Sequence, residues 1–143
     1  MKDASYEIRV GYIMALEGLK LDNELIISHD EIKPFDDDSM TYIVVSGQTF
    51  TDTSAKCGFA TDHAISLNIV TKFKLGYGTK KKSEDISNLV LARLIPESGD
   101  TLIVTPNFHI WNTKLTMAKT VVDETTERII TKILTFRHEI NQI

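Results

Sequence analysis

The sequence predicts an α+β fold, with a single domain over residues 1–143 in the order α-β-β-β-α-β-β and helices packed on one face of a mixed or antiparallel sheet. Three observations support this. Side chains alternate between apolar and polar over residues 62–73, as in a strand with one buried face. After a glycine-bracketed loop, apolar residues recur at steps of three and four, as in a helix. The segment 107–140 returns to alternation, broken only at residues 123–126, which predicts a long C-terminal β-hairpin.

The first predicted element is an amphipathic helix over residues 4–21. Four apolar side chains at helical spacing form its expected buried face: Ile8, Tyr12, Leu16 and Leu19. Ser5 is a suitable N-cap, and Glu7 falls in the first turn, where the helix dipole favours an acid. Gly11 and Gly18 each weaken the helix by about 1 kcal/mol relative to Ala.

Three strands are expected between the two helices. The apolar run 24–28 suits a short strand, and Pro34 prevents a helix from following it directly. Residues 40–53 form a second strand, because they are rich in β-favouring side chains. A connection over residues 54–61 leads into the third strand. One face of that strand is expected to carry five residues: Ile65, Leu67, Ile69, Thr71 and Phe73.

Capping and breaking residues bound the second helix. Ser83 is a suitable N-cap followed by acids in the first turn, and Pro96 and Gly99 mark the end. Its apolar stripe has four members: Ile86, Leu89, Val90 and Leu94. The hairpin that follows is expected to pair residues 108–122 with residues 127–140. Its expected tip is polar: Asp123, Glu124, Thr125 and Thr126.

The bulk composition excludes several classes of protein. A chain of 143 residues can bury roughly 70% of the surface that its unfolded form exposes, so it needs no disulfide staples. The net charge of −4 argues against a surface made entirely for nucleic acid. The single Cys57 is compatible with a reducing compartment. No segment approaches the ~20 apolar residues that cross a bilayer, and the start lacks a signal-peptide core, so we expect a soluble protein without membrane contact.

No arrangement of residues predicts a reaction. The four histidines lack the spacing of a helical metal pair: His29, His63, His109 and His138. His63 could join a buried network, and the last two histidines lie on the final strands, where they could be cross-strand neighbours. The acids at 36–38 lack the ligand order of an EF-hand and suit a solvated loop. We therefore expect no enzymatic activity, no metal and no cofactor.

Two features could contact a partner. Lys80, Lys81 and Lys82 precede the second helix but lack the spacing of a phosphate-binding loop. They could contact a polyanion or an acidic neighbouring subunit, or simply form a solvated loop. Trp111, the only tryptophan, either packs in the core, which we favour, or anchors a partner.

A resemblance to a known family spans nearly the whole chain. It rests on the N-terminal amphipathic helix followed by segments in a fixed order: 25–27, 42–47, 63–71, 84–94 and 128–137. In this order the chain resembles the tail-completion, or tail-terminator, proteins of tailed bacteriophages, which include minor tail protein U-like subunits. The resemblance implies a homo-oligomeric ring, hexameric or larger, at the end of the tail tube or at the head-to-tail neck.

The same resemblance implies a location and partners. It implies a virion protein that is assembled in the host cytoplasm, stops tube polymerisation and docks portal, neck or tail proteins, with non-specific contact to DNA in the lumen. We therefore expect the tip at residues 123–126 to reach an adjacent subunit or the next ring. The alternative function is a nucleic-acid or polyanion-binding module that uses the run 80–82 together with Lys72 and Lys74.

Overall fold

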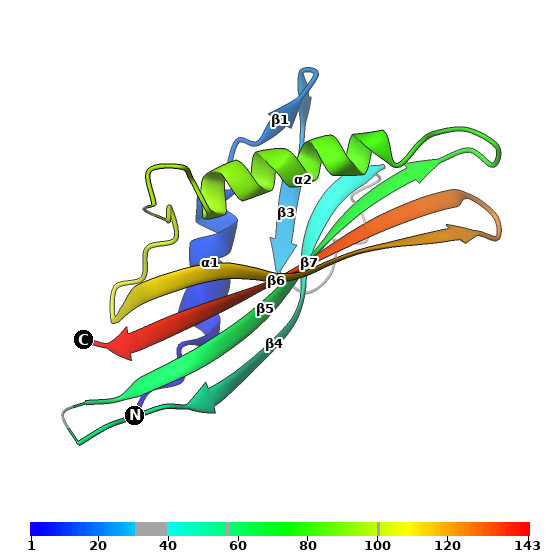
Figure 1. The fold of residues 1–143 in the computed structure, drawn as a ribbon. Helices are drawn as coiled ribbons and strands as arrows, with labels where there is room; N and C mark the ends of the chain where they lie inside the picture. Colours follow the sequence, from blue (N-terminus) through cyan, green and yellow to red (C-terminus); the bar gives the residue numbers. More distant parts are fainter. Residues whose placement is uncertain (31–39, 57, 100) are drawn as a thin grey trace.

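The computed structural model describes residues 1–30, 40–56, 58–99 and 101–143. In chain order the elements are α1 (Ser5–Ala15), β1 (Lys20–Leu21), β2 (Glu24–Leu25), β3 (Ile27–Asp30), β4 (Thr41–Asp52), β5 (Ala60–Phe73), α2 (Lys81–Leu94), β6 (Phe108–Glu124) and β7 (Arg128–Gln142). Five strands form one sheet in the order β3-β4-β5-β7-β6, and β1 pairs with β2 separately (Figure 1). Within the sheet, β3 runs parallel to β4 and the other neighbours are antiparallel.

Both helices pack on one face of this sheet, which confirms the predicted fold class. The ring of Tyr12 in α1 lies 6.0 Å from the ring of Phe136 in β7, centroid to centroid. Ile86 and Val90 of α2 are fully buried in the same hydrophobic core. Arg93 donates hydrogen bonds from the end of α2 to backbone carbonyls just after and at the end of α1. The two helices and the sheet therefore share one core.

The predicted alternation of β5 is confirmed. Ile65, Leu67 and Ile69 lie on the face covered by the helices and are almost completely buried. Thr71 on the same face is also buried, and its hydroxyl donates a hydrogen bond of 3.1 Å to the backbone oxygen of Ile130 in β7. The period of two thus located both the strand and its buried face.

The first helix is shorter than predicted. The sequence predicts residues 4–21, whereas α1 ends at Ala15 and Gly18 adopts a φ of +74°, a left-handed conformation that stops a helix. Leu16 and Leu19 are nevertheless buried. They keep the helical spacing although they lie beyond the helix, so the apolar period alone extended the prediction too far.

A small β-hairpin follows α1, a feature that the sequence pattern did not reveal. In it, Lys20 pairs with Leu25 across Asp22 and Asn23. These two turn residues have φ values of 49° and 68°, and two consecutive positive values are typical of a type I′ turn. The predicted strand over residues 24–28 is therefore divided between β2 of this hairpin and β3 of the main sheet.

Neither predicted N-cap caps its helix. Ala4 precedes α1 without a side-chain cap, and the hydroxyl of Ser5 donates to Oδ1 of Asp3 at 2.6 Å. Helix α2 begins before Ser83, whose buried hydroxyl donates to the backbone oxygen of Lys80 at 2.7 Å. Both serines lie inside the helices that they were expected to cap, so neither hydroxyl occupies the N-cap position from which a side chain accepts from the first N–H groups.

The predicted C-terminal hairpin is confirmed. β6 and β7 pair along their full lengths and extend slightly beyond the predicted ends, to Glu124 and Gln142. The register shifts at Trp111 and at Thr116, which are β-bulges that strengthen the local twist. Figure 1 shows the hairpin tip at the opposite end of the sheet from both chain termini.

Candidate functional site

Strand β6 is a long exposed edge of the sheet. It pairs with β7 on one side, and no strand in the described part of the chain pairs with its other side. Large apolar side chains are exposed along it: Trp111, Leu115, Met117, Val121 and Val122. A long strand with free backbone groups and exposed apolar side chains is a template for pairing with another chain.

An open groove of about 530 Å³ lies beside the first part of β6. We call it the Trp111 groove; it is bounded by the end of α2, residues 103–105, residues 108–113 and Ile143. None of the described residues that line it is Lys, Arg, Asp or Glu. Trp111 is 64% exposed and Val104 is 77% exposed at this groove. The preferred core position for Trp111 is therefore wrong, because the bulge at this residue takes the indole out of the regular alternation.

The opposite edge of the sheet carries a second exposed apolar surface. Met14 of α1, which is 66% exposed, Leu25 of β2 and Ile27 of β3 border a groove of about 390 Å³. We call these three residues the Met14 patch. Glu17 borders the same groove, and Asp22 is exposed in the nearby β1–β2 turn. Sequence reasoning missed this surface, because apolar residues on short elements produce no periodic pattern.

The predicted hairpin tip is exposed as expected. Asp123 and Glu124 end β6, and Thr125 and Thr126 form the turn before β7. The carboxylate of Glu124, at the end of β6, pairs with the guanidinium of Arg128, at the start of β7. Asp123, the other acid of the tip, makes no ion pair within the described residues. Contact of the tip with another subunit stays a prediction.

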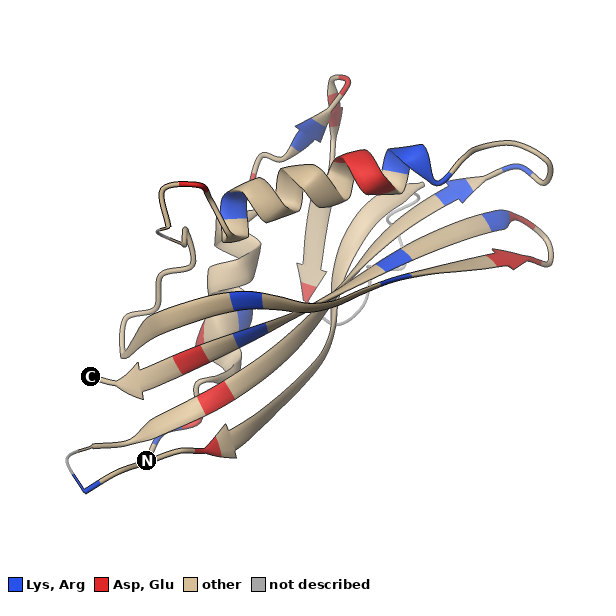
Figure 2. Ribbon diagram, in the orientation of Figure 1, with Lys and Arg blue, Asp and Glu red and all other residues tan. Residues whose placement is uncertain are grey.

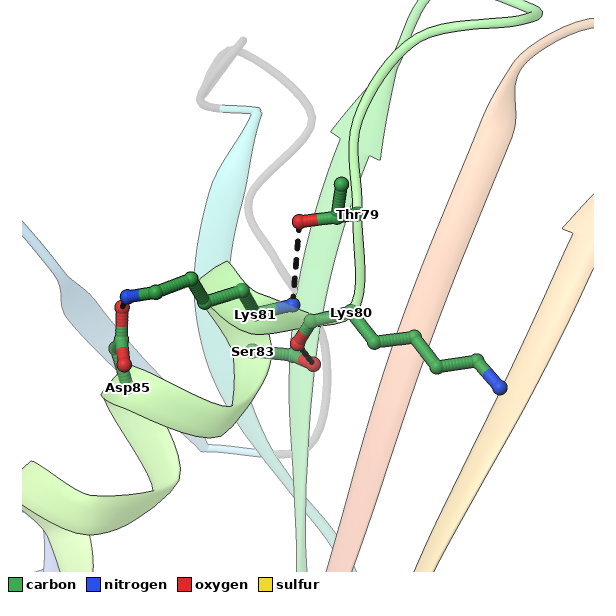
Figure 3. Close-up of polar contacts among 5 residues, drawn as sticks. All are labelled: Thr79, Lys80, Lys81, Ser83 and Asp85. Carbon is green, nitrogen blue, oxygen red and sulfur yellow. Dashed lines mark hydrogen bonds and ion pairs between the residues drawn. The ribbon is translucent and has the colours of Figure 1, made fainter.

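Two of the three lysines at the start of α2 are engaged within the chain. Nζ of Lys81 lies 2.8 Å from Oδ2 of Asp85, and this hydrogen bond and charge raise the pKa of Lys81 (Figure 3). Nζ of Lys82 lies 2.9 Å from Oε2 of Glu24, which ties the start of α2 to the β1–β2 hairpin. These pairs lower the net positive charge that the run offers to a polyanion.

Lys80 is the lysine of this run that makes no ion pair within the described residues. Its side chain extends away from Lys81 and its acidic partner (Figure 3). Lys72 lies over the ring of Tyr42, 5.5 Å from its centroid, on the sheet face away from the helices. Figure 2 shows acidic segments interspersed with basic ones along the strands. The lysines at 72, 74 and 80–82 therefore belong to a mixed surface.

A buried polar cluster joins α1 to the hairpin. Nε2 of His138 in β7 is hydrogen-bonded to the hydroxyl of Tyr12, and its Nδ1 lies 3.0 Å from Oγ1 of Thr113 in β6. Burial lowers the pKa of His138 to about 4, and the neighbouring His63 acts in the same direction. His63 faces His138 in register on β5 and stacks on Phe50. Burial also lowers the pKa of His63, so both imidazoles are neutral at pH 7.

The histidines confirm one expectation and correct another. His63 is buried on the helix-covered face as expected, but neither of its ring nitrogens has a hydrogen-bond partner within the described residues, so its place in a polar network stays a prediction. His109 and His138 are not cross-strand neighbours, because His109 pairs with Asn141 and His138 pairs with Thr113. The turn and the bulges fix the register of a hairpin. In this register, His109 lies close to the end of the hairpin that is farthest from the turn.

Two predicted features, the acids at 36–38 and Cys57, lie outside the described residues. Over the ranges that the structure does describe, no group of three or more His, Cys, Asp or Glu side chains is placed to hold a metal ion. In the same ranges, neither helix is long and apolar enough to span a membrane.

Comparison with known proteins gives a likeness in fold. No protein-family model matches the sequence, and no curated protein matches it either. Among solved structures, the chain is similar to a chain of the "Virion of native gene transfer agent (GTA) particle", with a TM-score of 0.77 and 13% sequence identity. The match covers 99% of this chain and 99% of the other. At this identity, the likeness shows that the two chains share a fold over nearly their whole lengths.

Proposed function

We propose that this chain is a structural virion protein, a subunit of a ring at the head-to-tail neck or at the end of the tail. The ring terminates or connects the tail and docks neighbouring portal, neck or tail proteins. The observation that carries the proposal is the fold shared over 99% of both chains with a component of a gene transfer agent virion. The sequence resemblance to tail-terminator proteins points to the same kind of particle.

The surfaces of the chain suit a ring subunit. A ring forms when one surface of each copy binds a different surface of the next and the rotation closes. The sheet offers two such surfaces, because β3 and β6 are its two edges and each borders exposed apolar side chains. The long β6–β7 hairpin adds an arm that projects away from both termini (Figure 1). It can reach an adjacent subunit or the next ring.

The alternative function, a polyanion-binding module, has less support. Lys81 and Lys82 are paired with Asp85 and Glu24, so only Lys80 of the run is uncompensated within the described residues. Contact with DNA in the lumen of a ring remains compatible with this arrangement, since it requires only a few exposed basic side chains near the lumen.

Negative-stain imaging of the purified chain, alone and with its tube or portal partner, tests the proposed function. We expect closed rings of uniform diameter that sit at the end of the tube or on the portal. Particles that remain monomeric at high concentration, with and without the partner, would overturn it.

A DNA titration across salt concentrations separates the two functions. For a ring protein we expect weak affinity that is unchanged by Lys80→Ala. A polyanion-binding module would instead bind with a steep salt dependence, and that dependence would shrink in the variant, because each phosphate contact releases counterions.

A further inference from the structure

The Trp111 groove and the Met14 patch lie at opposite edges of the sheet and on different sides of helix α1. Gly11 of α1 faces Ile103 and Val104, which belong to the wall of the Trp111 groove. Ile13 borders the groove beside the Met14 patch, and it lies about 200° around the helix from Gly11 at 3.6 residues per turn. One copy can therefore present both surfaces at once, in different directions, as a head-to-tail contact requires.

The apolar parts of the two surfaces are suited to cover each other. The Trp111 groove is concave, and its described lining includes the large apolar side chains of Phe108, Ile110 and Trp111. The Met14 patch supplies exposed, uncharged aliphatic side chains. An exposed indole beside a groove is also the kind of side chain that dominates protein interfaces.

The charges around the two surfaces are complementary. On β6, Lys114 lies three residues after Trp111, is exposed and makes no ion pair within the described residues. Glu17 borders the groove beside the Met14 patch, is exposed and is likewise unpaired in the described part of the chain. Complementary charges at the rim steer association and fix the orientation of the partners.

We propose that the Trp111 groove on the β6 edge of one copy receives the Met14 patch on the β3 edge of the next copy. In this contact, Lys114 of the first copy faces Glu17 of the second. This inference rests on the proposed ring function and names the two surfaces that build the ring.

Charge reversal with rescue tests the pairing. The single variants Lys114→Glu and Glu17→Lys each place like charges across the contact, and we expect each to weaken association by roughly tenfold or more. The double variant restores opposite charges at the contact, and we expect it to form rings again. Both positions are exposed, so the fold, followed by circular dichroism, should not change.

Two further variants sharpen the test. Trp111→Ser removes the indole from the groove, and we expect a loss of affinity of about tenfold or more because interface tryptophans carry much of the binding energy. Lys56→Glu reverses an exposed charge in the β4–β5 connection, at a residue that lines neither groove, and we expect it to form rings like the wild type.

The outcomes separate this inference from the function on which it rests. If the wild type forms rings and the two single variants form them equally well, or the double variant fails to rescue, the pairing of these two surfaces is wrong while the ring remains. If the wild type forms no ring under any condition, the proposed function itself fails.

Discussion

The buried His138 should make folding stability depend on pH between about 7 and 5. Its pKa is lowered from the usual 6.5 to about 4 by burial. Between these values the unfolded chain binds a proton at this position and the folded chain does not, so stability is full above the unfolded pKa and falls as the pH drops. From the two pKa values, lowering the pH from about 7 to about 5 should cost about 2 kcal/mol in the free energy of unfolding, and about 3 kcal/mol in total near pH 4.

The pKa values of three neighbouring groups, His63, Asp62 and Tyr12, are also shifted. The pKa of His63 is also lowered by burial, so it adds to the effect in the same direction. The pKa of Asp62 is lowered by the hydrogen bond from Arg137, so its contribution is present above about pH 4 and is lost only in more acidic solution. Tyr12 has a pKa raised by burial and stays neutral throughout this range.

Urea unfolding followed by circular dichroism at a series of pH values measures this dependence. In His138→Gln the amide retains a donor and an acceptor but does not titrate. We therefore expect the loss of unfolding free energy between pH 7 and 5 to be about 2 kcal/mol smaller in the variant than in the wild type. His109→Gln removes an exposed histidine from β6 and should retain the full dependence. A single protein concentration keeps any linkage to association constant. An equal loss of unfolding free energy between pH 7 and 5 in His138→Gln and in the wild type would refute the reasoning.

Three core and backbone substitutions should lower the free energy of unfolding. Leu134→Ala removes a fully buried side chain at the centre of β7, for an expected loss of about 3 kcal/mol in urea unfolding. Gly78→Ala should cost about 2 kcal/mol or more, because φ is +84° and the new Cβ would overlap the ring of Phe73. Gly11→Ala should cost about 1 kcal/mol by thermal unfolding despite its helix propensity, since a Cβ there lies 2.9 Å from Cγ2 of Ile103. A stability equal to or above wild type in any of the three would contradict the packing described for that position.

The sequence predicted the long strands because their physics is local. In β5 and β7 alternate residues are buried, and a period of two is visible without knowledge of the partner strand. The end of α1 was not visible in this way. Leu16 and Leu19 continue the apolar period after the helix has stopped, and the positive φ of Gly18 is one of several conformations that glycine allows.

The candidate surfaces could not be predicted from local sequence patterns, because they depend on contacts between residues that are distant in the sequence. The exposure of Trp111 follows from a one-residue shift in the register with β7, and such a bulge reverses which face a side chain occupies. The partner of Lys82 is Glu24, which is distant in sequence and reaches it only through the β1–β2 hairpin. Predicting that Lys82 is paired therefore required the tertiary fold.

A cryo-EM map of the assembled protein at a resolution that traces strands would test the proposed assembly most directly. We expect a closed ring in which β6 of each subunit lies against the β3 side of the next, with Trp111 covered at the contact. A ring in which Trp111 and Met14 both remain exposed to solvent, or a chain that yields only isolated monomers, would contradict it.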